Sequence, residues 1–336
     1  MVEICFATNR ILERDDQGQS IFGERAIPAE ARIVFGTATV EGSGLDDPDS
    51  YKVTSCTITE SRDLDVGLTA KLLAGDKDVL VFVHGAANAF ASALQRAAFN
   101  VNWLNQQDGR GFNVLMFSWP SRYYQIWNIV DAFQDYKRDQ EEAEASAWHV
   151  VQFLQALKLL RTRFRRRGMA LLAHSMGNFV LGFGVEGWFS EPRSGIIFDS
   201  AVLAAPDEPF NTFNYSHGRR LSDFWQITRD ISVYFSQNDI MMDLSLMVNS
   251  ELRLGDKGPP NHADTSFFPV EQYQFVDCAK VNDYTYFSFD QSHQYYRQSE
   301  TVRRDIGRVL RGLDTSGATR VYDLMENVYR LTTAGV

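Results

Sequence analysis

The segment 169–178, MALLAHSMGN, restricts the possible fold more than any other part of the sequence. An apolar stretch typical of a buried strand ends abruptly in His-Ser-Met-Gly, and a helix-compatible run, 178–189, follows. Strand, tight turn and helix in this order form a nucleophile elbow, usually written Gly-x-Ser-x-Gly. The sharp turn needs small residues two positions before and after the serine, where Ala173 and Gly177 stand. The segment therefore predicts that Ser175 is a nucleophile held between a strand and a helix.

Apolar runs alternate with helical patterns along most of the chain. Besides the elbow strand, strand-like runs cover residues 79–85, 113–118, 200–205, 231–236 and 273–281. Further helical patterns cover about 91–104, 141–166 and 295–313. This alternation predicts an α/β fold with a mostly parallel sheet flanked by helices. Catalytic side chains are then expected beyond the carboxyl ends of the strands.

The chain is expected to have three parts. Residues 76–313 form the α/β core, and residues 1–75 continue its sheet with antiparallel strands. Residues 314–336 are predicted to form a helical tail, because their apolar residues are spaced like one helical face. These residues are Val321, Leu324, Val328 and Leu331.

Composition narrows the classes of function. The chain has 336 residues, 44% hydrophobic and 23% charged, which suffices for one large domain with a substantial core. Its net charge of −10 disfavours nucleic acid or an anionic membrane surface as the main partner. We recognise no signal peptide and no membrane-spanning run, and therefore expect a cytoplasmic protein. The three cysteines form no disulfide or metal pattern, and neither a metal nor another cofactor is expected.

Two backbone N–H groups are candidates for an oxyanion hole. One belongs to Met176, which follows the elbow serine at the start of a helix. The other belongs to Ala86, in the loop after a strand that ends in His84-Gly85. We interpret His84 as a structural histidine that fixes this loop by hydrogen bonds; a catalytic base is the alternative.

The base and the acid are assigned by their order along the chain. Hydrolases with this elbow carry nucleophile, acid and histidine in that order, so the histidine comes late. His293 fits best, because it lies in a polar loop before the last long helix, and His262 is the alternative. Asp239 and Asp207 both follow strand-like runs, and we favour Asp239 because the acid more often follows the later strand.

Several linked strings resemble one known family. The strings are VFVHGAANAF, FSWPSR, LLAHSMGN, LAAPDE and SQNDI, followed by SHQYY. They resemble the α/β-hydrolase family long catalogued as a domain of unknown function, whose members share His-Gly-x-x-Asn, Phe-Ser-Trp-Pro-Ser and Ala-His-Ser-Met-Gly-Asn. The resemblance runs from Val79 to about Tyr296. FATNR (6–10) and FGTATV (35–40) also resemble that family's opening strands.

The resemblance implies an α/β-hydrolase fold with Ser175, Asp239 and His293 at the triad positions. It implies no substrate. Many members of the family carry a secretion or lipoprotein signal, which we do not recognise here, so their location is not carried over. The family commonly has an aromatic residue after His-Gly, where this chain has Ala86, and a more open pocket is expected there.

The surroundings of these groups predict a substrate pocket. Its candidate residues are His84, Asn88, Trp119, Tyr123, His174 and Asp207. The aromatic residues after the strand ends either line an apolar acyl pocket or pack loops onto the core, and the sequence favours neither.

The resulting hypothesis is a serine hydrolase that cleaves a carboxylic ester or thioester through an acyl-enzyme. Acyl transfer or carbon–carbon bond hydrolysis on the same residues is the alternative among enzymes. A catalytically idle hydrolase fold that serves as a binding or scaffold module is the alternative outside them. The expected partner is a small-molecule ester or acyl substrate, without nucleic acid, and the C-terminal tail is a candidate for self-association into a homo-oligomer.

Overall fold

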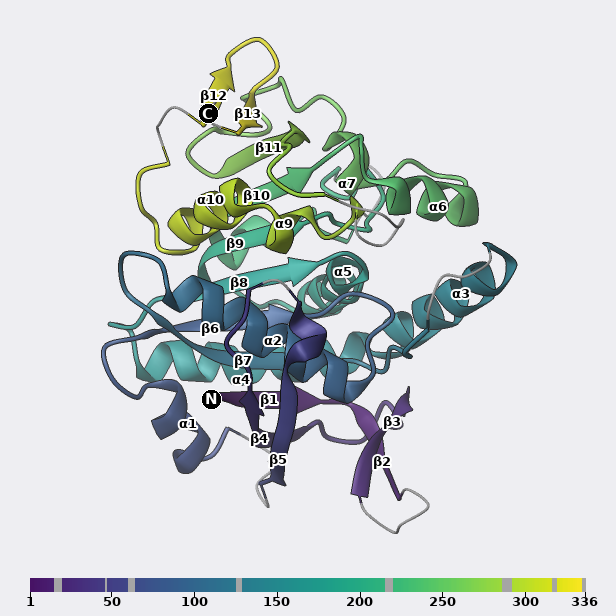
Figure 1. The fold of residues 1–336 in the computed structure, drawn as a ribbon, viewed down its shortest axis with the longest axis vertical. Helices are drawn as coiled ribbons and strands as arrows, with labels where there is room; N and C mark the ends of the chain where they lie inside the picture. Colours follow the sequence, from purple (N-terminus) through teal and green to yellow (C-terminus); the bar gives the residue numbers. More distant parts are fainter. Residues whose placement is uncertain are drawn as a thin grey trace.

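The computed structural model describes residues 1–14, 20–45, 47–59, 64–124, 129–214, 220–285, 292–315 and 319–333. An eleven-stranded sheet forms its centre. Its strands are β1 (Val2–Thr8), β4 (Val34–Glu41), β5 (Lys52–Ile58), β6 (Asp78–Val83), β7 (Phe112–Ser118), β8 (Met169–His174), β9 (Phe198–Ala204), β10 (Thr228–Phe235), β11 (Tyr273–Lys280), β12 (Arg320–Asp323) and β13 (Val328–Thr332). Their order across the sheet is β12-β13-β11-β10-β9-β8-β6-β7-β1-β4-β5, from top to bottom in Figure 1.

The sheet is parallel in its middle and antiparallel at its edges. Neighbouring strands from β13 through to β1 pair in parallel. The strands β4 and β5 at one edge and β12 at the other join antiparallel. The predicted fold class, a mostly parallel sheet with antiparallel N-terminal strands, is confirmed. A separate hairpin of β2 (Arg10–Arg14) and β3 (Ser20–Ala26) follows β1.

Helices cover both faces of the sheet, which explains the unbroken apolar runs of the central strands. In β6, Val79, Val81 and Val83 face one apolar layer, whereas Leu80 and Phe82 face the other. The first layer includes side chains of α1 (Val66–Leu72), α4 (Ala147–Arg163) and α5 (Met176–Phe189). The second includes those of α2 (Phe90–Asn105), α9 (Tyr295–Gln298) and α10 (Glu300–Leu310).

Two helices extend beyond the strand ends on the right of Figure 1. They are α3 (Ile129–Ala145) and α6 (Ile240–Asn249), and the Gln140 Nε2 of α3 donates to the Asn249 Oδ1 of α6 at 2.8 Å. The short α7 (Leu254–Lys257) follows α6, and single 3-10 turns occur at Pro48–Ser50 and Phe224–Gln226. The carboxyl ends of the parallel strands lie on this side.

Two predicted helices are in fact each divided in two. The pattern at 141–166 is split between α3 and α4 at Ser146, whose hydroxyl donates to the Glu142 carbonyl and accepts from Asn9. The pattern at 295–313 is split between α9 and α10 at Ser299, whose hydroxyl caps α10 by accepting from the Val302 N–H. In both cases a serine side chain competes with the backbone for hydrogen bonds, which helical periodicity does not register.

The prediction of a helical tail at 314–336 was wrong. The tail forms β12 and β13, and β13 pairs in parallel with β11. Without the tail, β11 would be an open edge strand, and pairing satisfies its backbone groups. The turn between the two strands ends at Asn327, which adopts a positive φ of 51° that asparagine tolerates well.

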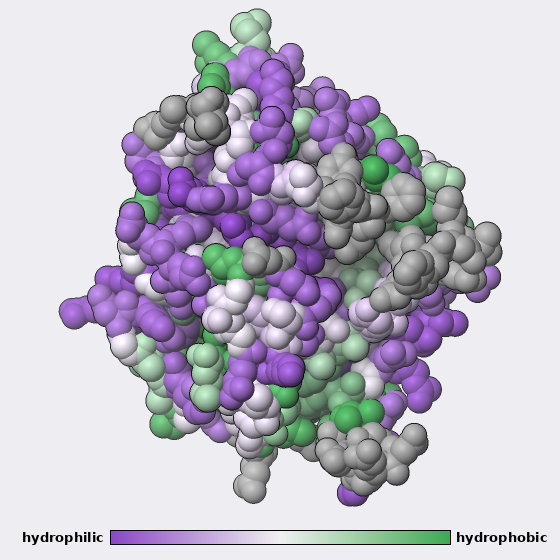
Figure 2. All heavy atoms as spheres, in the orientation of Figure 1, coloured by the Kyte–Doolittle hydropathy of each residue, from purple (hydrophilic) through white to green (hydrophobic). Residues whose placement is uncertain are grey.

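The outer surface is mixed in character. Figure 2 shows a face that is mostly hydrophilic, with hydrophobic residues scattered in small groups. None of the helices in the described ranges combines the length and the apolar character that crossing a membrane requires.

Candidate active site

Ser175 lies in a strained turn between β8 and α5. Its φ of 54° and ψ of −129° are uncommon for a residue with a side chain, and such strain is typical of functional sites. The turn is closely packed: a Cβ added to Gly177 would lie 2.6 Å from the His84 carbonyl oxygen and 2.7 Å from that of Val83. This contact explains why the position requires glycine. The residue Ser175 is itself only 8% exposed, at the base of a cleft.

His293 and Asp239 form a buried pair next to this turn. The Nδ1 of His293 lies 2.7 Å from the Asp239 Oδ2, and both side chains are almost fully buried. Asp239 follows β10 and caps α6 by accepting the Met241 N–H, which fixes its carboxylate. Burial raises the pKa of Asp239, whereas His293 opposes that shift. When Nδ1–H donates to this carboxylate, the neutral imidazole keeps Nε2 as its acceptor.

The competing aspartate, Asp207, is engaged elsewhere. Its carboxylate accepts from Arg253 at 2.8 Å and from the hydroxyls of Ser245 and Tyr136. Burial alone would raise the pKa of Asp207, but Arg253 and these hydroxyls together lower it below its usual value. The Asp207 N–H donates to the Ser175 carbonyl at 3.2 Å. Asp207 therefore ties α3, α6 and the Arg253 segment to the back of the elbow.

The competing histidine, His262, lies in a different part of the molecule. Its Nδ1 lies 2.8 Å from the Pro259 carbonyl oxygen, and its Nε2 lies 3.5 Å from the Glu326 carboxylate. It lines a shallow hollow beside β13, in which none of the other candidate residues takes part.

A cleft of about 360 Å³ brings most of the candidate residues together. Besides Ser175 and His293, it is lined by the predicted residues His84, Ala86, Asn88, Tyr123, His174 and Asp207. Trp119 is not among its lining residues: its ring is fully buried, stacks on His84 and donates to the His84 carbonyl. The aromatic residue that directly follows β7 therefore packs a loop onto the core.

Sequence reasoning missed several residues of the cleft wall. They are Asp49, Arg96, Tyr136, Met241, Met242, Gln294 and Tyr296. Tyr124, one of the aromatic residues after a strand end that the sequence offered for the pocket, does line the cleft. Met241 and Met242 directly follow the predicted acid, and Tyr296 follows the predicted base, so neighbourhood in sequence was an available signal for them. Tyr136 lies in α3, ahead of the helical pattern predicted at 141–166. Trp127 and Tyr215, which belong to the aromatic residues that the sequence places after the strand ends, lie outside the described residues.

The other two histidines of the cleft are buried and neutral. Burial, assisted by the positive charge of Arg10, lowers the pKa of His84 to about 3. Burial also lowers the pKa of His174 well below its usual value, and His293 and Arg297 add to this effect. The His174 ring packs against Tyr296, with ring centroids 4.3 Å apart. Both histidines are therefore unsuited to accept a proton near neutral pH.

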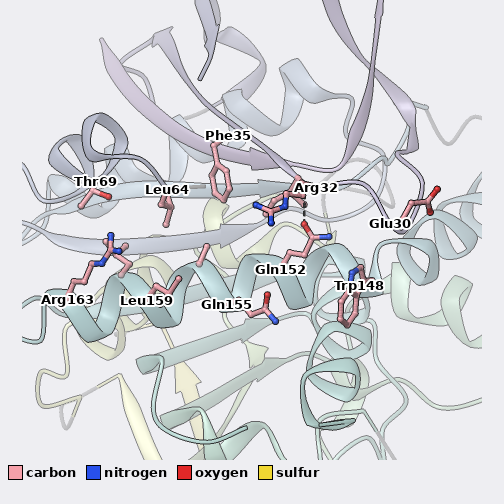
Figure 3. A pocket seen from close by; sticks show the side chains of 13 residues that line it. Glu30, Arg32, Phe35, Leu64, Thr69, Trp148, Gln152, Gln155, Leu159 and Arg163 are labelled. Carbon is pink, nitrogen blue, oxygen red and sulfur yellow. Dashed lines mark hydrogen bonds between the residues drawn. The ribbon is translucent and has the colours of Figure 1, made fainter. Parts of the chain in front are cut away.

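A second and larger hollow, of about 450 Å³, lies away from the elbow between α4, β4 and α1. Figure 3 shows Trp148, Gln152 and Leu159 of α4 facing Arg32 and Phe35 across it. Its described lining contains no serine, cysteine or histidine. The described residues also contain no group of three or more histidine, cysteine, aspartate or glutamate side chains that could hold a metal ion. The elbow cleft, which holds Ser175 and His293, is therefore the candidate active site.

The family comparison agrees with this architecture. A family model described as "Alpha/beta hydrolase of unknown function (DUF900)" matches residues 65–309. The chain belongs to this family. The match covers the sheet from β6 to β11 and both halves of the His293–Asp239 pair. No curated protein matches the sequence.

Solved structures resemble this α/β-hydrolase only distantly. A product of the gene lin2722 from Listeria innocua is 12% identical, with a TM-score of 0.37, over 76% of this chain and 99% of that one. A cold-adapted esterase from an Arctic intertidal metagenomic library is 12% identical, with a TM-score of 0.39, over 89% and 97%. Carboxylesterase CesB from Bacillus subtilis is 8% identical, with a TM-score of 0.33, over 85% and 90%.

Proposed function

We propose that the protein is a serine hydrolase that cleaves a carboxylic ester or thioester through an acyl-enzyme on Ser175. The observation that carries this proposal is the 2.7 Å contact between Asp239 and His293, because His293 lines the same cleft as the strained Ser175. A buried carboxylate on Nδ1 sets the tautomer and stabilises the imidazolium that forms during proton transfer. Removing a carboxylate and an imidazole from water is energetically unfavourable. A pair that is buried despite this cost, and that lies at the elbow, supports a functional role.

In the proposed reaction, Ser175 attacks the carbonyl carbon while the His293 Nε2 takes its proton. The N–H groups of Ala86 and Met176 hold the oxyanion. Met176 is the first residue of α5, and its N–H has no hydrogen-bond partner among the described residues. His293 then protonates the leaving alcohol or thiol, and water deacylates the serine by the reverse sequence. Asp239 stays ionised and orients the imidazole throughout.

The cleft favours a small substrate with an apolar acyl or alcohol part. Its volume lies near the lower end of the range for ligand pockets. Tyr123, Tyr124, Tyr136, Met241 and Met242 give it aromatic and thioether walls, which suit apolar groups. A cytoplasmic location belongs to the same proposal.

Ser175→Ala is the direct test. Because it removes the nucleophile and only one oxygen, we expect covalent labelling by a fluorophosphonate probe to disappear and ester turnover to fall about a thousandfold or more. Ser232→Ala is the matched control: Ser232 is a buried serine in β10 whose hydroxyl has no partner among the described residues. It should label and turn over like the wild type.

A panel of esters with different acyl chain lengths should be run beside the probe. Folded wild-type protein that neither labels nor hydrolyses any ester would contradict the proposal and favour a binding or scaffold role.

A further inference from the structure

Arg10 is a buried cation whose position needs an explanation. It is 1% exposed, and each of its hydrogen bonds in the described structure ends on an uncharged oxygen. Burial lowers the pKa of its guanidinium to about 9, an effect that Asp139 opposes from a distance. Burying a charge without a direct ionic partner is unfavourable, because the charge loses its hydration. A residue kept at such a cost suggests a task beyond packing.

The guanidinium of Arg10 connects three separate segments. Nη2 donates to the Asn88 carbonyl at 2.8 Å, in the loop after β6. Nη1 donates to the Ser121 carbonyl at 2.9 Å, after β7, and to the Gly23 carbonyl at 3.0 Å, in β3. Nε donates to the Ser118 hydroxyl at 2.9 Å, which in turn lies 3.3 Å from the His84 Nε2. The Arg10 side chain therefore holds both the loop that follows β6 and the loop that follows β7.

Asp139 of α3 holds the same two loops from the other side. Its carboxylate accepts from the Ser121 hydroxyl at 2.7 Å and from the N–H groups of Ala87 and Arg122 at 3.3 and 3.2 Å. The Ser121 hydroxyl oxygen also accepts from the Asn88 N–H at 3.1 Å. Arg10 and Asp139 thus balance each other's charge across Ser121. These three residues, Arg10, Ser121 and Asp139, are called the clamp below; none of them has a role in the proposed reaction itself.

The clamp holds a strained loop. Ala87 adopts a φ of 58°, in the left-handed region that is unfavourable for a residue with a side chain. The carbonyl groups of Gly85 and Ala86 accept from the Asn88 side chain at 3.2 and 2.7 Å. The His84 carbonyl accepts from Trp119 at 2.8 Å. The loop is therefore fixed by many hydrogen bonds in a conformation that it would not adopt alone.

The N–H groups of Gly85 and Ala86 make no hydrogen bond among the described residues, and the Ala86 N–H is the one proposed for the oxyanion hole. The N–H groups of the next two residues, Ala87 and Asn88, both donate. The loop also lies against the elbow, because a Cβ added to Gly85 would be 3.0 Å from the Ser175 Cβ. A free donor beside the nucleophile is what an oxyanion hole requires.

We infer that Arg10, Ser121 and Asp139 are positioning residues that hold the Ala86 N–H in place as an oxyanion donor. The inference rests on the proposed function, since it assigns these residues a role in the same reaction. None of the three touches the reacting atoms; they act through the loop. A donor that is fixed before the substrate arrives needs no reorganisation when the transition state forms. It can therefore stabilise the oxyanion most strongly in the transition state, which lowers the barrier.

Arg10→Lys tests this role, because it keeps the charge and removes the branched set of donors. We expect kcat per active site to fall about 10- to 100-fold, since misplacing a catalytic group by about 1 Å costs as much. The inhibition constant of a trifluoromethyl ketone, which mimics the tetrahedral intermediate, should rise by the same factor, whereas KM changes less than about threefold. Active sites are counted by fluorophosphonate labelling carried to completion.

Arg320→Lys is the matched control. Arg320 is another buried arginine, in the edge strand β12, which lies eight strands away from β1 in the sheet. Its replacement should leave kcat per labelled site and ketone affinity unchanged, whatever it does to the melting temperature. Ser121→Ala serves as a second, milder variant: it removes the acceptor of the Asn88 N–H and should lower kcat and ketone affinity together without removing a charge.

The outcomes separate this inference from the proposal on which it rests. If the wild type labels and turns over, but Arg10→Lys and Ser121→Ala keep full kcat per site and full ketone affinity, the clamp is only structural and the inference is wrong. If folded wild type neither labels nor turns over, the proposed function itself fails. A parallel loss of kcat and ketone affinity at constant KM supports the inference.

Discussion

At the scale of single residues, the two aspartates illustrate how environment decides function. Asp207 and Asp239 both follow a strand, yet one accepts from Arg253, Ser245 and Tyr136 and the other accepts from His293. Their position after a strand makes both aspartates candidates for the catalytic acid, and only their neighbours in the folded structure distinguish them. The Asp207 carboxylate, next to Arg253, holds neighbouring segments together. The Asp239 carboxylate, next to the His293 imidazole, is suited to catalysis.

This difference gives a prediction for the two asparagine variants. Asp239→Asn should lower kcat by about three to four orders of magnitude, because an amide no longer holds the tautomer that leaves Nε2 free. Asp207→Asn should cost far less activity but weaken the fold by roughly 3 kcal/mol, because Arg253 loses its charged partner. Steady-state kinetics and urea unfolding of both variants test this. Equal losses of kcat would contradict the assignment of the acid.

Residues that act through distant partners could not be predicted from the sequence. Ser175, Asp239 and His293 each stand at a strand end or before a helix, where the elbow pattern and the chain order point to them. Arg10 bonds to Ser121, which lies 111 positions away. Nothing in the local sequence of either one indicates that contact, which exists only because β1 pairs with β7.

At the scale of elements, the strands were easier to predict than the helix boundaries. Buried strands such as β6 and β8 are continuous apolar runs, and both were found within a few residues. The breaks at Ser146 and Ser299 depend on side-chain hydrogen bonds with Asn9, Glu142 and Val302. The terminal hairpin depends on an edge strand, β11, that needs a partner. These features depend on contacts in the folded structure, and the periodicity of apolar residues in the sequence carries no information about them.

The start of α5 gives a prediction at this scale. Gly177→Ala places a methyl group against the carbonyl oxygens of Val83 and His84, which are backbone atoms and cannot rotate away. We expect a loss of about 1 to 3 kcal/mol in stability, together with a large loss of activity, because relief of the clash moves Ser175 and Met176. Thermal unfolding and ester turnover measure the two effects.

Gly67→Ala in α1 is the matched control for this substitution. A Cβ there meets only the Asp65 Oδ1 at 3.4 Å, an ordinary contact. Alanine is the better helix former, so stability should rise by about 0.5 to 1 kcal/mol with activity unchanged. A Gly177→Ala variant as stable and active as this control would show that the turn has room for a side chain.

At the scale of the whole molecule, buried titratable groups make stability depend on pH. The pKa values of His84, His149 and His174 are lowered, in each case mainly by burial. Burial also raises the pKa of Asp139 to about 6, and stability from such a carboxyl is present at low pH and lost as pH rises. The two sets have opposite signs. The total curve therefore hides the individual contributions, and only a difference between variants isolates one of them.

His84→Asn isolates one such contribution. The folded pKa of His84, about 3, lies below the ordinary value of 6.5 that applies to the unfolded chain. Below pH 6.5 the unfolded chain therefore binds a proton at this histidine that the folded protein does not bind. The stability contribution is present above that pH and is lost as the pH falls toward 3. Asparagine cannot take up this proton. The wild type should therefore lose about 2 kcal/mol more than the variant between pH 7.5 and pH 5.0.

Urea unfolding of both proteins at several pH values measures this difference. Between pH 7.5 and 9, where the imidazole is neutral in both folded and unfolded chains, the difference should stay constant, which provides the internal control. A difference that also stays constant down to pH 5.0 would mean that His84 binds its proton in the folded state. The network that joins Arg10, Ser118 and His84 would then need a charged imidazole in place of the neutral ring described above.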